Sequence, residues 1–242
     1  MSKEQKVVAV IQARLTSSRL PGKVLLHLGG KTVLEQVADR VSRAESVDEI
    51  VIAVPDNPWN APLAKFINKK MRGVTCYCHP GPEDEVMQRT IFAAREAGAD
   101  IVVDVTSDCP LVDPKLIDNL VALLFKESEY TSNVVERSFP DGFDVQVYSL
   151  DMLQRIDPYV ILEKDRTHSG WNIVQYFSKA FPKKDKALHN ILAPKKYYYP
   201  EMRLTLDTKI DYQVLSKVFD HFDGDPPGFE KIIDYVLEEG IC

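Results

Sequence analysis

The feature of the sequence that most restricts the fold is a series of four short apolar runs in its first half. They are rich in β-branched residues. Polar and apolar positions do not alternate in them, as they do in a strand with one solvent-exposed face. Continuous apolar runs predict strands that are covered on both faces, as in a parallel sheet. The runs are VVAVIQ (Val7 to Gln12), EIVIAV (Glu49 to Val54), VTCYC (Val74 to Cys78) and IVVDVT (Ile101 to Thr106).

Amphipathic segments separate these runs and predict helices. One apolar stripe spans Val33 to Val41, and a second spans Leu63 to Met71 after Asn60 as an expected N-cap. A third helix is expected at about 83–97, and Asp113, which precedes a proline, predicts the N-cap of a fourth. Strands that alternate with helices form right-handed βαβ units, which predicts a three-layer α/β/α sandwich.

The pattern loosens in the second half of the chain, where short strand-like and helix-like segments follow one another without a repeat or a linker. The expected elements are a strand in GFDVQVYS, a helix over Arg166 to Phe177, a strand in EMRLTLD and two closing helices near 210–222 and 228–239. We therefore expect one domain over residues 1–242 with an inserted arm at roughly 132–202.

Composition excludes several classes of protein. The chain has 242 residues and a formal net charge of -6, and this acidic balance argues against a nucleic-acid partner, which needs a basic face. Its four cysteines include the pair Cys76 and Cys78 but no second pair at zinc-ligand spacing. No stretch approaches the roughly 20 apolar residues of a membrane helix, and the amino terminus lacks a signal-peptide core. We expect a cytoplasmic protein with no membrane partner.

The loop that follows the first run, IQARLTSSRLPGKVL, combines cations with free backbone N–H groups. It holds Arg14, Arg19 and Lys23, and Ser17 adds a hydroxyl. Loops at the carboxyl edge of a parallel sheet bind ligands in α/β proteins, and three cations suit a triphosphate. The alternative is a solvated loop with scattered charges. Neither a Walker A loop nor a G-x-G-x-x-G motif is present.

Carboxylates follow two further segments that are expected to end at the same edge. Asp108 comes directly after the fourth apolar run, and Asp207 ends EMRLTLD. If these segments are neighbours, the two carboxylates and a triphosphate form a Mg²⁺ site, since magnesium takes few protein ligands plus phosphates and water. Asp211 lies in the first turn of the next helix, where the helix dipole gives it a structural alternative. Asp104 lies within the run, and its role is open.

These segments resemble, in order and across nearly the whole chain, the cytidylyltransferases that activate acidic sugars. The family includes CMP-Kdo synthetase, CMP-sialic acid synthetase and, most similar, the spore-coat polysaccharide F-type proteins. The opening motif and the last one are the more specific. The motifs that carry the resemblance are IQARLTSSRLPGKVL, GPEDEVMQR, TSDCPLVDP, FPDGFDVQVYS, DRTH and RLTLDTKIDY.

The resemblance implies a mostly parallel, mixed sheet of the nucleotide-diphosphosugar transferase type, and transfer of CMP from CTP to an acidic, sugar-like acceptor with release of pyrophosphate. It also implies Mg²⁺ as cofactor and a homodimer formed through the inserted arm. The residue roles that it implies fall into three groups. The nucleotide is bound by Ala13, Arg14, Ser17, Arg19, Lys23 and Arg89, the metal by Asp108, Asp207 and Asp211, and the acceptor by Asp144, Arg166 and His168, with Arg14, Lys23, Asp108 and Asp207 catalytic.

The sequence departs from the family pattern chiefly on the acceptor side. Gln146 stands where many relatives have Glu, and DRTHSGWN differs from the usual REHVT-like run. These departures put acceptor identity in doubt more than CTP binding. For His168, a structural role on a helix remains an alternative. The alternative functions are a nucleotidyltransferase that uses another nucleotide, a glycosyltransferase on the same fold, and a nucleotide sensor without turnover.

Overall fold

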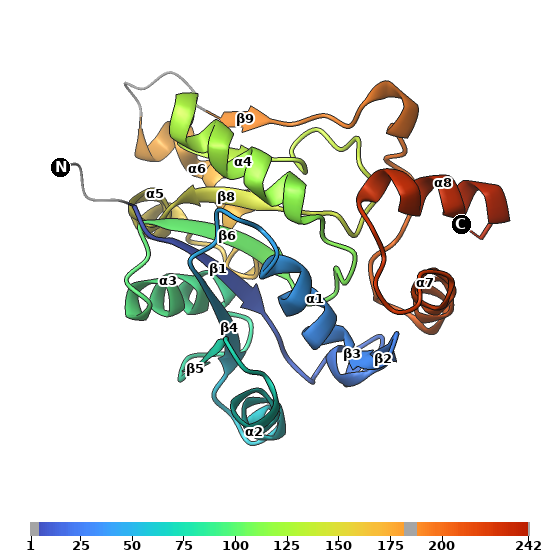
Figure 1. The fold of residues 1–242 in the computed structure, drawn as a ribbon. Helices are drawn as coiled ribbons and strands as arrows, with labels where there is room; N and C mark the ends of the chain where they lie inside the picture. Colours follow the sequence, from blue (N-terminus) through green and yellow to red (C-terminus); the bar gives the residue numbers. More distant parts are fainter. Residues whose placement is uncertain (1–4, 182–187, 242) are drawn as a thin grey trace.

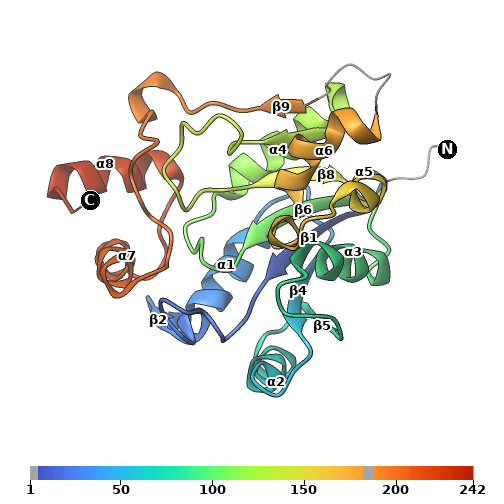
Figure 2. The same cartoon turned by 180° about the vertical axis from the view of Figure 1, so that it is seen from behind.

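A seven-stranded sheet forms the centre of the molecule (Figures 1 and 2). The computed structural model describes residues 5–181 and 188–241. The strand order in the sheet is β5-β4-β1-β6-β8-β7-β9, and β2 and β3 form a separate hairpin. The strands are β1 (Val7–Gln12), β2 (His27–Leu28), β3 (Lys31–Thr32), β4 (Glu49–Pro55), β5 (Thr75–His79), β6 (Ile101–Thr106), β7 (Tyr130–Ser132), β8 (Gln146–Ser149) and β9 (Leu188–Asn190).

The four predicted strands β5, β4, β1 and β6 are adjacent and parallel, which confirms the parallel half of the sheet. β8 then pairs antiparallel with both β6 and β7, and β9 runs parallel to β7. The sheet is therefore mostly parallel and mixed, as the family resemblance implies.

Helices cover both faces of this sheet. Figure 1 shows α1 and α4 on one side and α3, α5 and α6 on the other, with α7 and α8 packed together at one end. The helices are α1 (Val33–Val41), α2 (Ala61–Lys70), α3 (Val86–Glu96), α4 (Pro114–Glu127), α5 (Leu150–Ile156), α6 (Gly170–Ala180), α7 (Lys209–His221) and α8 (Phe229–Glu239). This arrangement is the predicted three-layer sandwich.

β1 shows why continuous apolar runs produce this architecture. Val7, Ala9 and Ile11 are buried in the core beneath α1 and α4, whereas Val8 and Val10 are buried in the core beneath α3 and α5. Successive side chains of a strand point to opposite faces, so a strand between two helical layers needs apolar residues at every position. Burial of each such side chain contributes about 1.5–3 kcal/mol.

Four helices, α1, α4, α5 and α7, begin at a side chain that accepts from the N–H groups of the first turn. Asp113 caps α4 as predicted, because its carboxylate accepts from the N–H groups of Lys115 and Leu116. Asn60 precedes α2 but does not cap it; its side-chain oxygen instead accepts from the N–H of Leu15 at 2.7 Å. The expected capping role of Asn60 is therefore wrong, and the residue anchors the opening loop.

Two expected elements in the second half differ from the structure. The helix expected from Arg166 begins only at Gly170. EMRLTLD forms no strand; Arg203 makes a single bridge with Asp141, and the N–H of Leu206 donates to the carbonyl of Asp108. The apolar residues alternate in this segment because one side of the loop is buried.

Most of the segment expected as an inserted arm, residues 132–202, lies on the central sheet. β8 and β9 are strands of that sheet, and residues of α5 and α6 are buried in one of its two cores. Residues 182–187 of this segment lie outside the described residues. A role for the segment in dimer formation stays a prediction.

One buried arginine ties the carboxyl-terminal pair of helices to the sheet. Arg40 of α1 donates to the carbonyls of Val112, Pro226 and Pro227 at 2.7, 2.5 and 3.0 Å. Since buried carbonyls need donors, these bonds fix the loop that connects α7 with α8. Among the described residues, no helix combines the length and the apolar character that a membrane crossing requires.

Candidate active site

A cavity of about 350 Å³ opens at the carboxyl ends of β1 and β6. Gln12, the last residue of β1, and Thr106, the last residue of β6, both line it. This edge of a parallel sheet is where α/β proteins bind ligands. Most of the predicted site residues meet here: the cavity is lined by Ala13, Arg14, Ser17, Arg19, Lys23, Arg89, Asp108, His168 and Asp207.

Lys23 and two aspartates form the centre of this site. The Lys23 ammonium lies 2.7 Å from Oδ2 of Asp108, 2.9 Å from Oδ1 of Asp207 and 2.8 Å from the carbonyl of Leu206. The adjacency of Asp108 and Asp207 follows from the hydrogen bond of 2.8 Å between the N–H of Leu206 and the carbonyl of Asp108. Residues separated by almost a hundred positions therefore converge on one buried cation.

The charges in this cluster stabilise one another. Burial alone would lower the pKa of Lys23, but the carboxylate of Asp108, followed by that of Asp207, raises it above its ordinary value. Burial would likewise raise the pKa of Asp207, but Lys23, with help from Arg19 and Arg203, lowers it. The one cation of the central cluster thus holds its two carboxylates in place.

The turn that delivers Lys23 depends on a glycine. Gly22 has a φ of 70° and directly precedes the short 3₁₀ turn Lys23–Leu25. This left-handed conformation is strained for residues with a Cβ, whereas no protein atom lies within 4 Å of the place where a Cβ of Gly22 would stand. The glycine is therefore required by the backbone conformation.

Arg14 lies on another side of the same cavity. Its guanidinium forms ion pairs of 3.1 Å with both Glu83 and Asp84. Glu83 also accepts from Thr16 and from the side-chain amides of Asn57 and Asn60. These bonds hold the opening loop against the GPEDE segment, so that Arg14 faces the cavity without contacting the two aspartates.

Arg89 is buried, with 2% of its surface exposed, and is held by two acceptors. Its Nε donates to Gln12 at 2.7 Å, and its Nη1 donates to the carbonyl of Glu83 at 2.8 Å. Burial, and then the positive charge of Arg14, lower the pKa of Arg89 to about 10. Among residues 5–181 and 188–241 no carboxylate pairs with Arg89, so this buried arginine provides a fixed positive charge at the cavity wall.

A second cavity, of about 630 Å³, adjoins the first one. Asp144 and His168 line it, and His168 lines both cavities. Asp144 is held by two hydrogen bonds from Arg137, at 2.9 and 2.7 Å. The second cavity thus contains two of the three residues predicted to bind the acceptor.

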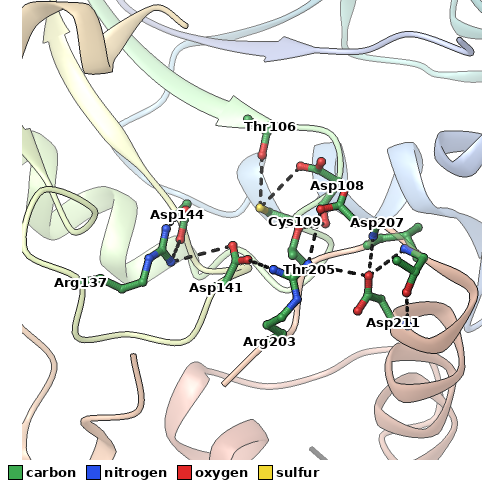
Figure 3. A network of polar contacts seen from close by, with 12 residues as sticks. Thr106, Asp108, Cys109, Arg137, Asp141, Asp144, Arg203, Thr205, Asp207 and Asp211 are labelled. Carbon is green, nitrogen blue, oxygen red and sulfur yellow. Dashed lines mark hydrogen bonds and ion pairs between the residues drawn. The ribbon is translucent and has the colours of Figure 1, made fainter. Parts of the chain in front are cut away.

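A chain of alternating charges connects the two cavities (Figure 3). Arg137 contacts Asp144 and Asp141, Asp141 accepts from Arg203 at 2.9 Å, and Arg203 reaches Asp207 at 3.4 Å. Burial, and then the charge of Asp144, raise the pKa of Asp141. The two ends of the site are therefore coupled through charged side chains.

Gly142 permits the close approach on which this chain of charges depends. It has a φ of 120°, and a Cβ there would stand 2.5 Å from the carbonyl oxygen of Leu204. Any side chain at position 142 would push this loop away from the backbone of Leu204 and Thr205, which directly follow Arg203.

Two predicted residues have other surroundings. Arg166 donates to Glu85, to the carbonyl of Val160 and to Asp157, and it lines neither of the two cavities. Asp211 completes a capping box at the start of α7, where its carboxylate accepts from the N–H groups of Asp207 and Thr208 at 2.9 and 2.7 Å. Arg166 thus holds its own loop, and Asp211 orients the backbone of Asp207.

Three polar residues of the cavity walls were not predicted as site residues, although two of them, Asp104 and Gln146, were noted in the sequence. Gln12 orients Arg89, while Asp104 and Gln146 line both cavities. The positions of Gln12 and Asp104 contained a signal, because Gln12 ends the otherwise apolar β1 and Asp104 interrupts the apolar run of β6.

Comparisons with known proteins agree with this geometry. A family model described as Cytidylyltransferase matches residues 8–161. The spore coat polysaccharide biosynthesis protein SpsF of Bacillus subtilis is 28% identical over 227 residues, which cover 88% of this chain and 86% of that protein. The structure of a cytidylyltransferase from Leptospira borgpetersenii serovar Hardjo-bovis has a TM-score of 0.84 at 28% identity, covering 98% of this chain and 96% of that one.

The same fold occurs in a more distant structure. A CMP:2-keto-3-deoxy-manno-octonic acid synthetase complexed with CTP has a TM-score of 0.61 at 17% identity, covering 90% of this chain and 99% of that one. The family model covers more than half of the chain and includes the opening loop and Asp108. The chain therefore belongs to the cytidylyltransferase family.

Proposed function

We propose that this protein transfers CMP from CTP to a small, sugar-like acid and releases pyrophosphate. The observation that carries the proposal is the convergence of Lys23, Asp108 and Asp207 at the edge of a cavity that Arg14 and Arg89 also line. The three cations are of the kind that binds a nucleoside triphosphate, and the two carboxylates are of the kind that binds its metal. Family membership and the CTP complex of a structural neighbour support CTP as the donor.

The residues around Lys23 fit a divalent cation of the magnesium type. The Lys23 ammonium is itself a cation held by three oxygen atoms, two from carboxylates and one from the carbonyl of Leu206. Within residues 5–181 and 188–241, no group of three or more His, Cys, Asp or Glu side chains is placed to hold a metal. Two carboxylates with phosphates and water are what Mg²⁺ usually takes. When bound by Asp108 and Asp207, it would supply charge neutralisation on the phosphates.

The chain's own residues bind and orient the triphosphate. Arg14, Arg19 and Lys23 offer positive charge along the opening loop, where they stabilise the negative charge that grows on the leaving pyrophosphate. An acceptor oxygen attacks the α-phosphorus in line, the new O–P bond forms, and the bond from that phosphorus to the bridging oxygen of pyrophosphate breaks. Positioning and electrostatics supply most of the catalysis in such transfers.

The acceptor occupies the second cavity in this proposal. His168 lies where the two cavities meet, and Asp144 is held there by Arg137. Arg166 contributes by holding the loop before α6 and not by contact with the acceptor. A homodimer formed through residues 132–202 belongs to the same proposal, and sedimentation of the purified protein tests it.

A pyrophosphate-release assay tests the function. Wild-type protein is incubated with Mg²⁺, each of the four nucleoside triphosphates and a panel of acidic sugars, phosphonates and polyol phosphates. We expect acceptor-dependent release with CTP and its loss in Asp207→Asn. Preferential release with UTP, ATP or GTP would reassign the donor, and CTP binding without release across the panel would indicate a nucleotide sensor.

A further inference from the structure

Two side chains at the junction of the cavities have no role in the function proposed above. Asp104 of β6 and Gln146 of β8 are direct partners in the antiparallel register, and both line both cavities. Directly opposed residues of an antiparallel pair have Cβ atoms about 4.5–5.5 Å apart and point to the same face. The junction is therefore bounded by one carboxylate and one amide that stand side by side.

Each of these side chains is oriented by a buried tyrosine. Tyr148 donates to Oδ2 of Asp104 at 2.8 Å, and Tyr130 donates to Oε1 of Gln146 at 2.8 Å. The two tyrosines are opposed in the β7–β8 register, and their rings lie parallel with centroids 6.3 Å apart. The N–H of Gly170, at the start of α6, donates to the same Oδ2 at 3.3 Å.

These contacts give a hydrogen-bond partner to one polar atom of each side chain and none to the other. In the described part of the chain, neither Oδ1 of Asp104 nor Nε2 of Gln146 has a hydrogen-bond partner, and no Lys or Arg forms an ion pair with Asp104. Asp104 is nevertheless 8% exposed. Burial raises the pKa of the Asp104 carboxyl, and the bonds from Tyr148 and Gly170 and the charge of His168 act against that rise. Buried carboxyls that keep an open oxygen are found where a ligand completes them.

From this arrangement we propose that Asp104 and Gln146 are specificity-determining residues that select an acceptor carrying a hydroxyl group at the junction. A hydroxyl both donates and accepts, so it can donate to Oδ1 of Asp104 and accept from Nε2 of Gln146. A carboxylate or phosphonate only accepts and is negative, and Asp104 repels it. The acidic group of the acceptor therefore lies away from the junction. This inference rests on the proposed function and names the two residues that recognise a hydroxyl of its acceptor.

The test compares acceptors that differ by one hydroxyl, for example 2-hydroxyethylphosphonate and ethylphosphonate, in the pyrophosphate-release assay with CTP. Wild-type protein should prefer the hydroxylated member of each pair. Asp104→Asn should lower kcat/KM for that member about 10- to 100-fold, the range for a lost hydrogen bond to a charged group, and reduce the preference. The KM for CTP should change less than about twofold, since this bond touches the acceptor alone.

A matched control and a stability measurement separate recognition from a structural role. Asp100→Asn changes the residue just before β6, at the other end of that strand, where the carboxylate accepts from the N–H of Lys6; its acceptor kinetics should equal those of wild type. Asp104→Asn keeps an oxygen for Tyr148 and Gly170 and removes a carboxyl whose charged form burial destabilises, so its melting temperature should equal or exceed that of the wild type.

Three results would overturn the inference: equal use of both members of a pair by wild-type protein, an undiminished preference in Asp104→Asn, or a lower melting temperature of Asp104→Asn. Failure of the proposed function is recognised separately, because wild-type protein would then release no pyrophosphate from CTP with any acceptor. In that event the melting temperature of Asp104→Asn still distinguishes the two roles of Asp104. A higher value than in wild-type protein supports a side chain that faces a ligand, and a lower value shows that Asp104 stabilises the fold.

Discussion

Replacement of Lys23 by methionine tests the central cluster most directly, because it keeps the length of the side chain and removes its charge. The Lys23 side chain is 10% exposed, and its partners Asp108 and Asp207 are 27% and 15% exposed. Loss of one partner from a fully buried pair costs about 3–5 kcal/mol. The partial exposure of both carboxylates lets water compensate, so we expect a loss of about 2 kcal/mol of unfolding free energy. For a chain of this size that corresponds to a melting temperature lower by about 4–8 °C.

The same substitution should strengthen metal binding. In wild-type protein a divalent cation competes with the Lys23 ammonium for Asp108 and Asp207, whereas in Lys23→Met it does not. If displacement of the Lys23 ammonium costs the metal about 1.4 kcal/mol or more of binding free energy, the metal affinity of Lys23→Met exceeds that of wild type at least about tenfold. Thermal unfolding in EDTA and in increasing MgCl₂, together with calorimetric titration of Mn²⁺ in the absence of nucleotide, measures both effects.

Two further variants show whether the effect comes from this cluster. Lys31→Met removes an ammonium that pairs with Asp39 at 3.2 Å on the surface, and it should leave both the metal affinity and the Mg²⁺ response unchanged. Lys23→Met combined with Asp207→Asn should bind metal more weakly than Lys23→Met alone. The reasoning is refuted if Lys23→Met is as stable as wild type in EDTA, or if it binds Mn²⁺ no more tightly.

The remaining predictions concern catalysis, pH and the scaffold. Asp207→Asn should lower kcat by about 10²-fold or more with an unchanged circular dichroism spectrum; near-normal formation of the CMP product contradicts the role. Asp207 has a lower pKa folded than unfolded, so its contribution to stability is complete above its ordinary pKa of 3.8 and is lost as pH falls through the lowered value. The free energy of unfolding, measured in urea from neutral pH down to about pH 2, should therefore fall less with decreasing pH in Asp207→Asn than in wild-type protein. Arg40→Met should cost about 2–4 kcal/mol in the same assay, since three carbonyls lose their donor.

The parallel half of the fold could be predicted because its signals are local. The residues of β1 are apolar at successive positions, and this alone implies burial on both faces. Asp113 before a proline implies a capped helix, since the cap is formed within a few residues of the same segment. The cations Arg14 and Lys23 were placed at the correct edge because a loop after a parallel strand must start there.

The second half could not be predicted to the same degree because its structure depends on partners that are distant in sequence. The alternation of Met202, Leu204 and Leu206 is the same for an edge strand and for a loop with one buried side. What decides between them is that Leu204 and Leu206 donate to the carbonyls of Asp141 and Asp108, which lie on different segments. The start of α6 is likewise set by a distant partner, because Arg166 is held by Glu85.

The mixed sheet explains why the two cavities of the site draw their walls from different halves of the chain. The parallel strands β1 and β6 end at the first cavity and carry the opening loop and Asp108, which face the nucleotide in our proposal. The antiparallel strand β8 comes from the second half of the chain and adds Gln146 beside Asp104, so the wall between the cavities combines one residue from each half. We therefore expect a substitution of Gln146 to change what the second cavity accepts and to leave the hydrogen bonds of Lys23 intact. This separation accounts for departures from the family pattern that gather in the second half, with Gln146 at the boundary where acceptor and nucleotide must meet.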